Sequence, residues 1–325
     1  MTRVFFIVGP TATGKSEIAA DVARKVGAEI VSADAFQIYC GLDLLTAKPD
    51  AVTLAKAPHH LIGTLPFAEE LNAEKFRRLA FRVIDEINSR GRLAIVVGGS
   101  GLYIKALTHG LAVLPEADPN LREKLNAMSL DELHSQIAKL DPEAAKRIDA
   151  KNRRRLVRAL EICLLTGKPA SAQREQSARN AGNLACVTTS GLVARSSQTG
   201  LSASPTRGVF VFRDRQELYE RINQRVEMMF ERGVIEEVRT AMEMSATASQ
   251  MIGLREIREL LAGKQSLPQC MAEIQQATRR YAKRQLTWFR GQTNFSPLNL
   301  SFLTHNEAVK RISLRILSEA GTRDD

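Results

Sequence analysis

A short stretch near the start of the chain has the residue types and spacing of a phosphate-binding loop. Its sequence is GPTATGKS, which fits the pattern G-x-x-x-x-G-K-[ST]. In such a loop the glycines let backbone N–H groups turn toward phosphate oxygens, a lysine adds positive charge, and a serine hydroxyl can bind Mg²⁺. A turn that only joined a strand to a helix would not need Lys and Ser after its last glycine. The predicted polyphosphate site comprises Gly9, Pro10, Thr11, Ala12, Thr13, Gly14, Lys15 and Ser16, with Ser16 as the Mg²⁺ ligand.

The loop alone does not identify the polyphosphate, because ATP, GTP and a prenyl diphosphate present similar oxygens. An acidic residue at the end of a neighbouring strand would narrow the chemistry. Asp34 ends the apolar run AEIVSAD, and in an open α/β sheet the carboxyl ends of the strands border the ligand crevice. Asp85 and Glu86 fall within a predicted helix, away from its apolar face, and we interpret them as solvated. Asp34 is therefore the candidate acid–base residue.

Strand and helix patterns alternate around these residues. Residues 3–8 and 92–97 are short apolar runs typical of buried strands, and residues 28–34 are predicted as a further strand. Residues 74–90 are predicted as a helix, with an apolar face made by Phe76, Leu79, Val83 and Ile87. Strands that alternate with helices predict a parallel sheet covered on both faces.

The pattern changes along the chain and indicates an insertion. From about residue 116 it reads as helices separated by polar turns, and residues 171–206 have little periodicity and are predicted to be loop or poorly ordered. A strand pattern returns at 208–212, and two long helical patterns follow at 215–243 and 267–290. We expect an α/β fold with a P-loop NTPase-like parallel sheet core and a mainly helical insertion domain. The expected parts are a core at 1–115, the insertion at 116–206, and a return to the core with C-terminal helices at 207–325.

The composition is that of an ordinary globular protein. The chain has 325 residues, and 46 Lys and Arg against 36 Asp and Glu give a net charge of +10. These values argue against a mainly disordered chain, a collagen-like fibre and a disulfide scaffold. No apolar run approaches the roughly 18–20 residues that span a bilayer. The four cysteines lie far apart without a CxxC pair, which favours reduced, non-catalytic thiols. We expect a cytoplasmic protein that does not bind membranes.

Two basic stretches indicate a polyanionic partner. The first contains Lys151, Arg153, Arg154, Arg155 and Arg158 and has no acid until Glu161, and the second has no acid at all. In the second stretch, Arg279 and Lys283 are four residues apart, as are Arg280 and Arg284, so each pair shares one face of a helix. Like charges at that spacing repel, and a nucleic acid would neutralise them. A solubilising face is the alternative, but it would more often mix the two signs.

Six segments in this order resemble the tRNA dimethylallyltransferase family. The family transfers an isopentenyl group to the N6 amine of adenosine 37, beside the anticodon. The resemblance therefore implies dimethylallyl diphosphate as donor, a tRNA anticodon stem-loop as acceptor, Mg²⁺ as cofactor and a monomeric enzyme. The segments are GPTATGKS (9–16), SADAFQIYCGLDLLTAKP (32–49), PHHLIG (58–63), VVGGSGLYIKAL (96–107), NRRRLVRALEI (152–162) and TRRYAKRQLTWFR (278–290).

The same resemblance assigns roles to individual residues. It implies that Lys15 and its loop hold the diphosphate, that Asp34 accepts a proton from the adenine amine, and that Ser100 stands at the family's usual threonine in the site. Leu45 and Leu254 depart from the family's usual Gly and Tyr. The residues predicted to contact tRNA, the last four of them from the charge pattern alone, are Asp34, Ala35, Phe36, Gln37, Ser100, Arg122, Arg154, Arg155, Leu156, Val157, Arg158, Gln250, Met251, Ile252, Gly253, Leu254, Arg255, Arg279, Arg280, Lys283 and Arg284.

Three other functions fit part of the sequence. An ATP-dependent kinase shares the nucleotide-binding type of loop but has no need of a basic C-terminal helix. A prenyltransferase of free adenine nucleotides would not need the basic insertion, and a non-enzymatic RNA-binding module would not need GPTATGKS and Asp34. Trp288 is expected to pack a helix onto the core, and His59 and His60 to have a structural or substrate-pocket role. Tyr103 fits packing and pocket lining equally well.

Overall fold

The computed structural model describes residues 3–112, 114–173, 207–241, 244–292 and 295–321. The chain divides into two compact units. We call Met1–Thr108 together with Ser204–Asp325 the core unit, and His109–Ala203 the helical unit. The boundaries expected from the sequence were 115/116 and 206/207. Each unit is described by itself.

A six-stranded parallel sheet forms the centre of the core unit. Its strands have the order β3-β2-β4-β1-β5-β6, so the chain crosses over repeatedly between neighbours. Val8, the last residue of one central strand, is paired with Gly98, the last residue of the next, and Ser32 is paired with Val97. The carboxyl ends of these three strands therefore lie at the same edge of the sheet. The strands are β1 (Val4–Val8), β2 (Glu29–Ser32), β3 (His59–His60), β4 (Ala94–Gly98), β5 (Gly208–Phe212) and β6 (Ser296–Asn299).

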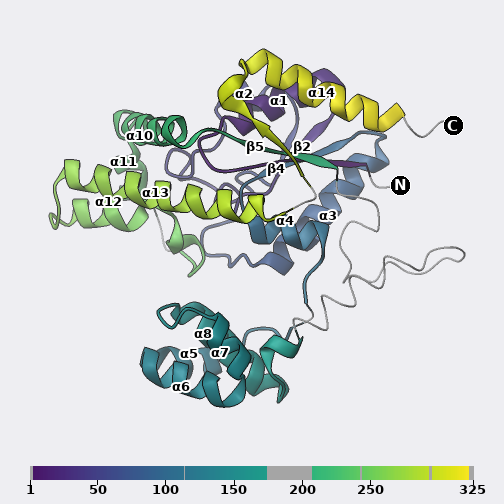
Figure 1. The fold of residues 1–325 in the computed structure, drawn as a ribbon. Coiled ribbons are helices and arrows are strands. Elements are labelled where there is room, and N and C mark those ends of the chain that lie inside the picture. Colours follow the sequence, from purple (N-terminus) through teal and green to yellow (C-terminus); the bar gives the residue numbers. More distant parts are fainter. Residues whose placement is uncertain (1–2, 113, 174–206, 242–243, 293–294, 322–325) are drawn as a thin grey trace, which may run out of the picture. The chain divides into compact units, whose positions relative to one another are not determined.

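Helices cover both faces of the sheet, as Figure 1 shows. The helices α1 (Lys15–Val26) and α14 (His305–Gly321) pack together on one face. Their apolar side chains and those of β1, β4 and β5 form one buried cluster. The helices α3 (Ala73–Ser89) and α4 (Gly101–Thr108) pack on each other on the opposite face, and the short α2 (Ala51–Leu54) contacts α1. The α/β fold with a parallel sheet is thus confirmed.

Two sequence predictions are corrected in this part of the chain. The strand predicted for 28–34 is shorter, because β2 ends at Ser32 and Asp34 lies in the following loop. The buried face of α3 is rotated from the predicted one: Leu79 and Val83 are only partly buried, while Ala80 and Ile84 are fully buried beside Phe76 and Ile87. Asp85 and Glu86 are exposed, as expected for a solvated face.

The remaining helices of the core unit pack side by side. The helix predicted at 267–290 is α13 (Leu267–Arg290), which contacts α10, α12 and α4. The helix predicted at 215–243 is interrupted, because Gly233 adopts the left-handed conformation with φ 93° and ends the first helix. The two resulting helices are α10 (Arg215–Glu231) and α11 (Val234–Arg239). Farther along the chain lie α12 (Leu254–Leu261) and short 3-10 turns at Ala248–Gln250 and Leu300–Phe302.

The helical unit is built from short, individually capped helices. Asp118, Ser129, Asp141 and Asn152 each precede a helix and accept a hydrogen bond from a backbone N–H in its first turn. Residues 170–173 are also helical, and the rest of the predicted loop at 171–206 lies outside the described residues. The apolar faces form one core around Leu133, Leu156 and Leu160. The four capped helices are α5 (Pro119–Ala127), α6 (Leu130–Leu140), α7 (Pro142–Arg147) and α8 (Arg153–Thr166).

None of the helices in the described residues combines the length and the hydropathy needed to cross a membrane.

Candidate active site

The loops that follow four parallel strands meet at one edge of the sheet. The phosphate-binding loop follows β1, the Asp34 loop follows β2, Ser100 follows β4, and Arg213 follows β5. The Gly9 N–H donates to the Gly98 carbonyl at 3.2 Å, and the Ala33 N–H donates to the Val97 carbonyl at 2.7 Å. The structure thereby brings together the residues that the sequence predicts for the diphosphate and for proton transfer.

The phosphate-binding loop has the backbone conformation that its sequence predicts. Gly14 has φ 86°, a left-handed conformation that glycine adopts without strain, and it directly precedes α1. The Thr13 hydroxyl donates to the Pro10 carbonyl at 3.0 Å, and the Lys15 Nζ donates to the same carbonyl at 3.2 Å. The first N–H groups of α1 have no carbonyl partner within the helix and suit an anion. Ser16, the second residue of α1, is partly exposed.

The ammonium of Lys15 is held in a site that disfavours its charge. Burial lowers its pKa from 10.5 to about 8, because the charged form loses hydration. The negative charge of Asp34 opposes this effect, and the positive charge of Arg225 adds to it. Asp34 therefore lies close enough to Lys15 to affect its charge, and a bound anion would restore the ammonium.

Three arginines that the sequence analysis missed surround the phosphate-binding loop. The Arg213 Nε donates to the Thr13 carbonyl at 3.0 Å, and the Arg221 Nε donates to the Ala12 carbonyl at 2.8 Å. The Arg225 Nη1 donates to the Thr11 hydroxyl at 2.8 Å. Its Nε is buried and has no partner in the described part of the chain, which leaves a donor for a bound anion.

The sequence contains a signal for these arginines. Arg213 directly follows β5, so the rule that selected Asp34 after its strand would also have selected Arg213. Arg221 and Arg225 are four residues apart on α10, the same spacing as the basic pairs on α13. Only the structure shows that both helical arginines turn toward a loop some 210 residues earlier in the chain.

The Asp34 loop presents a carboxylate beside a fixed turn. The Asp34 Oδ1 accepts hydrogen bonds from the Phe36 N–H at 2.9 Å and the Gln37 N–H at 3.3 Å. Its Oδ2 has no hydrogen-bond partner among the residues that the structure describes, so it can take a proton. The Ser100 Oγ accepts from the Ala35 N–H at 3.1 Å and joins the β4 turn to this loop. Residues 34–37 are all partly exposed.

Two residues of α13 connect these loops, and the sequence analysis assigned no role to either. The Gln285 Nε2 donates to the Gly99 carbonyl at 2.9 Å, and its Oε1 accepts from the Thr11 N–H at 2.9 Å. Burial and the nearby charge of Asp34 raise the pKa of Tyr281, whose hydroxyl also interacts with Ser100 and Gln285. The sequence signal for Gln285 and Tyr281 is weak, because an amide and a phenol within a basic helix are also typical of an exposed face.

Several aromatic and histidine residues are structural. A Cβ on Gly101 would lie 2.6 Å from the Trp288 ring, so Trp288 packs against the start of α4, as predicted. Tyr103 is buried and stacks on Phe76 with ring centroids 4.2 Å apart, which supports a packing role. The His60 Nε2 lies 2.8 Å from the carboxylate of Glu29, and the His59 Nδ1 lies 2.7 Å from the Ala57 carbonyl. These histidine contacts agree with the structural role.

The predicted basic face of α13 is only partly free. Arg280, Lys283 and Arg284 are exposed and form no ion pair within the described residues. The Arg279 Nη1 instead donates to the Asn223 Oδ1 at 2.7 Å, which ties α13 to α10. Arg279 therefore has a structural contact in addition to its predicted one with tRNA.

The turn at 250–255 exposes only some of its predicted contact residues. Gln250 and Arg255 are exposed and Ile252 is partly exposed, whereas Met251, Gly253 and Leu254 are buried. The Arg255 Nη2 donates to the Glu256 Oε1 at 2.9 Å. Any side-chain contact with a large partner is thus restricted to three of the six residues.

In the helical unit too, only some of the predicted contact residues are exposed. Arg154 and Arg155 are exposed on α8, but Leu156 and Val157 are buried in the core of the unit. Arg122 and Arg158 pair with the fully buried carboxylate of Glu161, with 2.9 Å between the Arg122 Nε and the Glu161 Oε1. Arg122 and Arg158 thus stabilise this unit through Glu161, and Leu156 and Val157 pack inside it.

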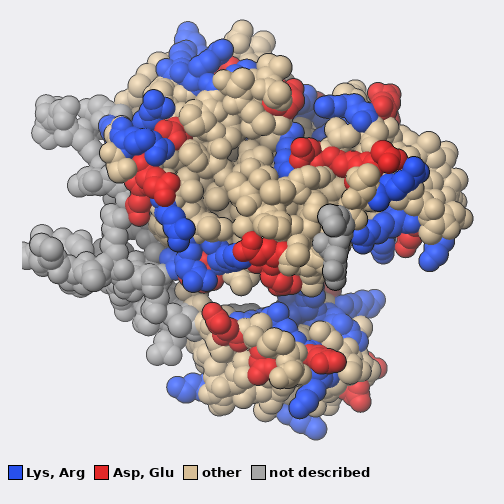
Figure 2. All heavy atoms as spheres, turned by 180° about the vertical axis from the view of Figure 1, so that it is seen from behind, with Lys and Arg blue, Asp and Glu red and all other residues tan. Residues whose placement is uncertain are grey.

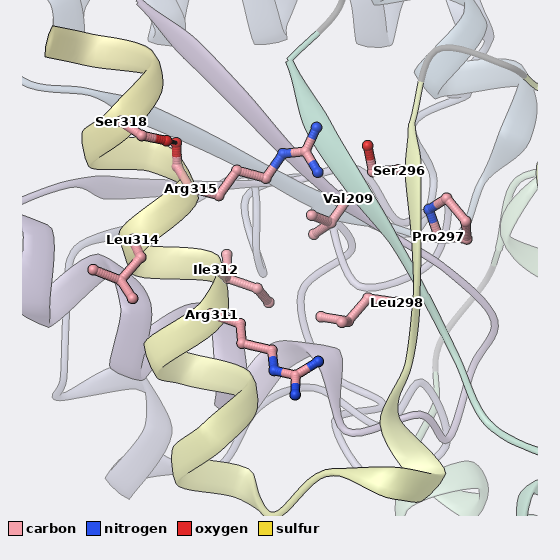
Figure 3. Close-up of a pocket in the computed structure, with 9 residues that line it drawn as sticks. All are labelled: Val209, Ser296, Pro297, Leu298, Arg311, Ile312, Leu314, Arg315 and Ser318. Atoms are coloured by element: carbon pink, nitrogen blue, oxygen red, sulfur yellow. Dashed lines mark hydrogen bonds between the residues drawn. The ribbon is translucent and has the colours of Figure 1, made fainter.

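Other surface features lie away from the site. Figure 2 shows Lys and Arg side chains on both units, interspersed with Asp and Glu over the visible face. A cavity of about 460 Å³ lies between β5, β6 and α14. Arg311, Arg315, Leu298 and Ile312 are among the residues that line it, as Figure 3 shows, and none of the candidate site residues does so. The described residues contain no group of three or more His, Cys, Asp or Glu that could hold a metal ion.

Comparison with solved structures supports the fold. The full-length tRNA isopentenylpyrophosphate transferase of Bacillus halodurans is 32% identical, with a TM-score of 0.67 and 98% of each chain covered. A eukaryotic dimethylallyltransferase solved while acting on tRNA has a TM-score of 0.75 at 23% identity, covering 98% of this chain and 80% of the other. The second likeness is one of fold alone.

Comparison of sequences identifies the family. A tRNA dimethylallyltransferase of Citrifermentans bemidjiense is 42% identical over 88% of this chain and 89% of its own length. A tRNA dimethylallyltransferase of a Caulobacter species is 41% identical over 90% of this chain and 91% of its own. The model of the IPP transferase family matches residues 37–292. On this evidence, and with the phosphate-binding loop and Asp34 at one edge of the sheet, the chain belongs to the IPP transferase family of tRNA dimethylallyltransferases.

Proposed function

We propose that this protein transfers the dimethylallyl group of dimethylallyl diphosphate to the N6 amine of adenosine 37 in tRNA and releases diphosphate. The observation that carries this proposal is the position of Asp34, in the loop after β2, at the sheet edge where the phosphate-binding loop follows β1. A carboxylate beside an anion site suits a reaction that needs a base close to a departing diphosphate. A kinase site would not explain the relatives, which are named for prenyl transfer to tRNA.

The phosphate-binding loop and its arginines would hold the diphosphate. Lys15, Arg213, Arg221 and Arg225 bring four positive charges to the loop. Negative charge accumulates on the diphosphate as its bond to the allylic carbon breaks. Cations and backbone N–H groups fixed in advance stabilise that charge without reorganising during the reaction. This arrangement therefore favours departure of diphosphate from a delocalised allylic carbon.

Asp34 would act as the general base. The adenine nitrogen forms a bond to the allylic carbon as the bond from that carbon to the diphosphate oxygen breaks, and the nitrogen's proton passes to Asp34. The lone pair of the exocyclic nitrogen is delocalised into the ring, so removal of this proton favours attack. Oδ1 already accepts two backbone N–H groups, and Oδ2 is the oxygen that would take the proton.

Mg²⁺ is the cofactor that we propose for this site. The partly exposed Ser16 hydroxyl is an oxygen ligand of the type that Mg²⁺ prefers. Mg²⁺ in phosphate sites commonly takes one or two protein ligands and completes its shell with phosphate oxygens and water, so a larger acidic cluster is not required. When bound, the ion would neutralise charge on the diphosphate.

The proposed tRNA surface combines the Asp34 loop with exposed cations. Residues 34–37 would contact the target nucleotide, which must leave its stack to reach Asp34. In the core unit, Arg280, Lys283 and Arg284 offer charges for the phosphate backbone, and in the helical unit, taken by itself, Arg154 and Arg155 do so. We further propose a monomeric enzyme, as the resemblance to the family implies, and a cytoplasmic one, because the proposed acceptor is tRNA.

A direct test incubates the purified protein with dimethylallyl diphosphate, Mg²⁺ and unmodified tRNA, followed by mass analysis of the nucleosides. The expected product is N6-dimethylallyl adenosine at position 37. Parallel reactions replace the donor with ATP, or the tRNA with free adenine nucleotides. Product from the nucleotides but not from tRNA would reject the proposed acceptor, and phosphate transfer from ATP would indicate a kinase.

The role of Asp34 is tested by Asp34→Asn, which keeps the side-chain shape and the oxygen that accepts the backbone N–H groups. We expect the single-turnover rate to fall by roughly 10²–10⁴-fold, as is typical when a general base is lost. Binding of donor and tRNA should change little. Asp85→Asn is the matched control, because Asp85 is exposed on α3, and it should behave like the parent. An unchanged rate for Asp34→Asn would remove Asp34 from the mechanism.

A further inference from the structure

A short helical turn at residues 42–48 lies beside the Asp34 loop. The Thr46 N–H donates to the Leu42 carbonyl at 3.0 Å, the Lys48 N–H to the Asp43 carbonyl at 3.0 Å, and the Ala47 N–H to the Leu44 carbonyl at 3.1 Å. The first N–H groups of such a turn have no carbonyl partner within it, and its last carbonyls are equally unpaired. Both ends therefore need partners from elsewhere.

Glu237 of α11 supplies the partner at the first end. The Leu44 N–H donates to its Oε1 at 2.8 Å, and the Leu45 N–H donates to its Oε2 at 2.9 Å. A carboxylate that accepts two backbone N–H groups makes charge-assisted hydrogen bonds, which are about twice as strong as neutral ones. A residue about 190 positions later in the chain thus holds this turn.

Gln37 supplies the partner at the last end. Its Nε2 donates to the Ala47 carbonyl at 2.9 Å and approaches the Thr46 carbonyl at 3.5 Å. The Gln37 N–H also donates to the Asp34 Oδ1 at 3.3 Å. A continuous series of hydrogen bonds therefore runs from Glu237, through the turn, to Gln37 and the proposed base.

We propose that Glu237 is a positioning residue for prenyl transfer, acting through the turn at 42–48 on Gln37 and Asp34. This role rests on the proposed function of the site. If the carboxylate is removed, the Leu44 and Leu45 N–H groups lose their acceptors, and the carbonyls that orient the Gln37 amide are no longer held. Gln37 and the base then sample arrangements that do not fit the flipped adenine. Small misplacements of this kind reduce the rate of the bound complex more than its formation.

Lys48 makes a second set of contacts near this turn, and these contacts differ from those of Glu237. The Lys48 Nζ donates to the Tyr39 carbonyl at 2.6 Å and to the Gly41 carbonyl at 2.9 Å, and it also pairs with Asp43. Lys48 thus contacts two carbonyls that precede the turn and the carboxylate of Asp43, but no N–H group of the turn. Loss of Glu237 should loosen the turn without releasing the whole segment.

The test compares Glu237→Ala with Glu237→Gln and the control Glu236→Ala. Glu236 is adjacent on α11, its side chain is 63% exposed, and it pairs only with Arg239 among the described residues. Hydrogen exchange of the peptide that spans residues 42–48 should accelerate in Glu237→Ala and stay at the parent value in Glu236→Ala. Glu237→Gln retains one acceptor oxygen and should give an intermediate rate.

Steady-state kinetics complete the test. We expect kcat for tRNA prenylation to fall by about 10- to 100-fold in Glu237→Ala, with an unchanged KM for dimethylallyl diphosphate and partial rescue in Glu237→Gln. In a double-mutant cycle, Glu237→Ala should add little to Gln37→Ala, because Glu237 acts through Gln37. Additive effects, unchanged exchange, or accelerated exchange at parental kcat would each overturn the proposal. A parent protein inactive on tRNA would instead reject the proposed function, whereas the exchange result reports on the turn independently.

Discussion

At the scale of single residues, the site concentrates positive charge before any substrate is bound. Lys15, Arg213, Arg221 and Arg225 all contact the phosphate-binding loop. Burial lowers the pKa values of Arg213 and Arg225, and it lowers the pKa of Lys15 to about 8. These groups repel one another, and an entering diphosphate relieves that repulsion. Part of the affinity for the donor should therefore come from the relief of unfavourable charge.

The binding of diphosphate should weaken above pH 8 in the parent protein. Lys15 loses its proton as the pH rises through about 8, and neutral lysine no longer attracts the anion. Above that pH the affinity should fall about ten-fold per unit, since binding then requires uptake of one proton. Calorimetric titration with inorganic diphosphate in buffers of different ionisation enthalpy should detect this uptake. Lys15→Met should bind more weakly and lack this part of the pH dependence.

The lowered pKa of Lys15 has the opposite effect on the free energy of unfolding. The unfolded chain keeps this proton up to its ordinary pKa of 10.5, whereas the folded chain loses it above about 8. Between these values the unfolded state binds more protons, so the Lys15 contribution to stability increases with pH. Between pH 8 and 10.5, the affinity for diphosphate should therefore fall while the Lys15 contribution to the free energy of unfolding rises. Both changes are expected of a buried Lys15 ammonium. Proton uptake equal in the parent and Lys15→Met would contradict it.

The sequence predicted the residues of the site that belong to continuous motifs. Asp34 could be selected because it follows a strand, and GPTATGKS because its pattern is local. Arg221, Gln285 and Glu237 were not selected, because each acts on a loop in a distant part of the chain through a contact that helix packing creates. Residue type and spacing carry no information about such contacts until the neighbouring element is known.

At the scale of elements, the helical unit depends on a buried acidic residue. Glu161 of α8 is fully buried, and its carboxylate accepts from the Asp118 N–H at 3.0 Å as well as pairing with Arg122 and Arg158. The Arg158 Nη2 in turn donates to the Pro115 carbonyl at 2.7 Å. This network joins the start of α5 to the middle of α8. The resemblance to the family selected both arginines for tRNA, whereas their position in the network is visible only in the structure.

Glu161→Ala should destabilise the helical unit. It leaves two guanidinium groups and one N–H without their acceptor. Removing one partner of a buried pair costs about 3–5 kcal/mol, and because both arginines are partly exposed we expect about 2–3 kcal/mol. Urea unfolding followed by circular dichroism can measure the change. Glu143→Ala, which removes two exposed ion pairs on α7, should stay within about 0.5 kcal/mol of the parent. Equal midpoints for the two variants would show that the network contributes no stability.

Helix boundaries and faces were the less predictable part of the elements. The limits of α13 were predicted, because its capping residue Ser266 and its long amphipathic pattern are local signals. The interruption before α11 was missed, since Gly233 within a helical pattern is often tolerated. Two of the four residues predicted for the buried face of α3 were one position away, because apolar residues also occur beside the residues that are buried.

At the scale of the whole molecule, the parallel sheet turns distant sequence segments into neighbours. Alternating strand and helix patterns predicted the sheet, but they do not give its order of β3-β2-β4-β1-β5-β6. That order places β1 between β4 and β5, so the loops after all three strands meet. The core unit is completed only after residue 204, and the arginines of α10 can reach the phosphate-binding loop because the chain returns to the sheet.

The charge distribution over the molecule leads to the last prediction, that binding of tRNA weakens steeply with salt and that α13 accounts for part of this dependence. Each Lys or Arg that contacts a phosphate releases condensed counterions, so the loss of three contacts should reduce the log–log salt slope by about 2–3 units. The variant is Arg280→Ala, Lys283→Ala and Arg284→Ala combined. It omits Arg279, whose bond to Asn223 supports helix packing.

A matched control removes two exposed cations from a different helix of the core unit. Lys310→Ala with Arg311→Ala changes α14, which packs on α1 and lies outside the predicted contact residues. Filter binding at several salt concentrations should give a parental slope for this control and a flatter one for the α13 variant. Phosphate contacts do not read bases, so the α13 variant should lose affinity equally for cognate and non-cognate anticodon stem-loops. If both variants reduced the slope in proportion to the charge removed, net charge rather than the face of α13 would attract the tRNA.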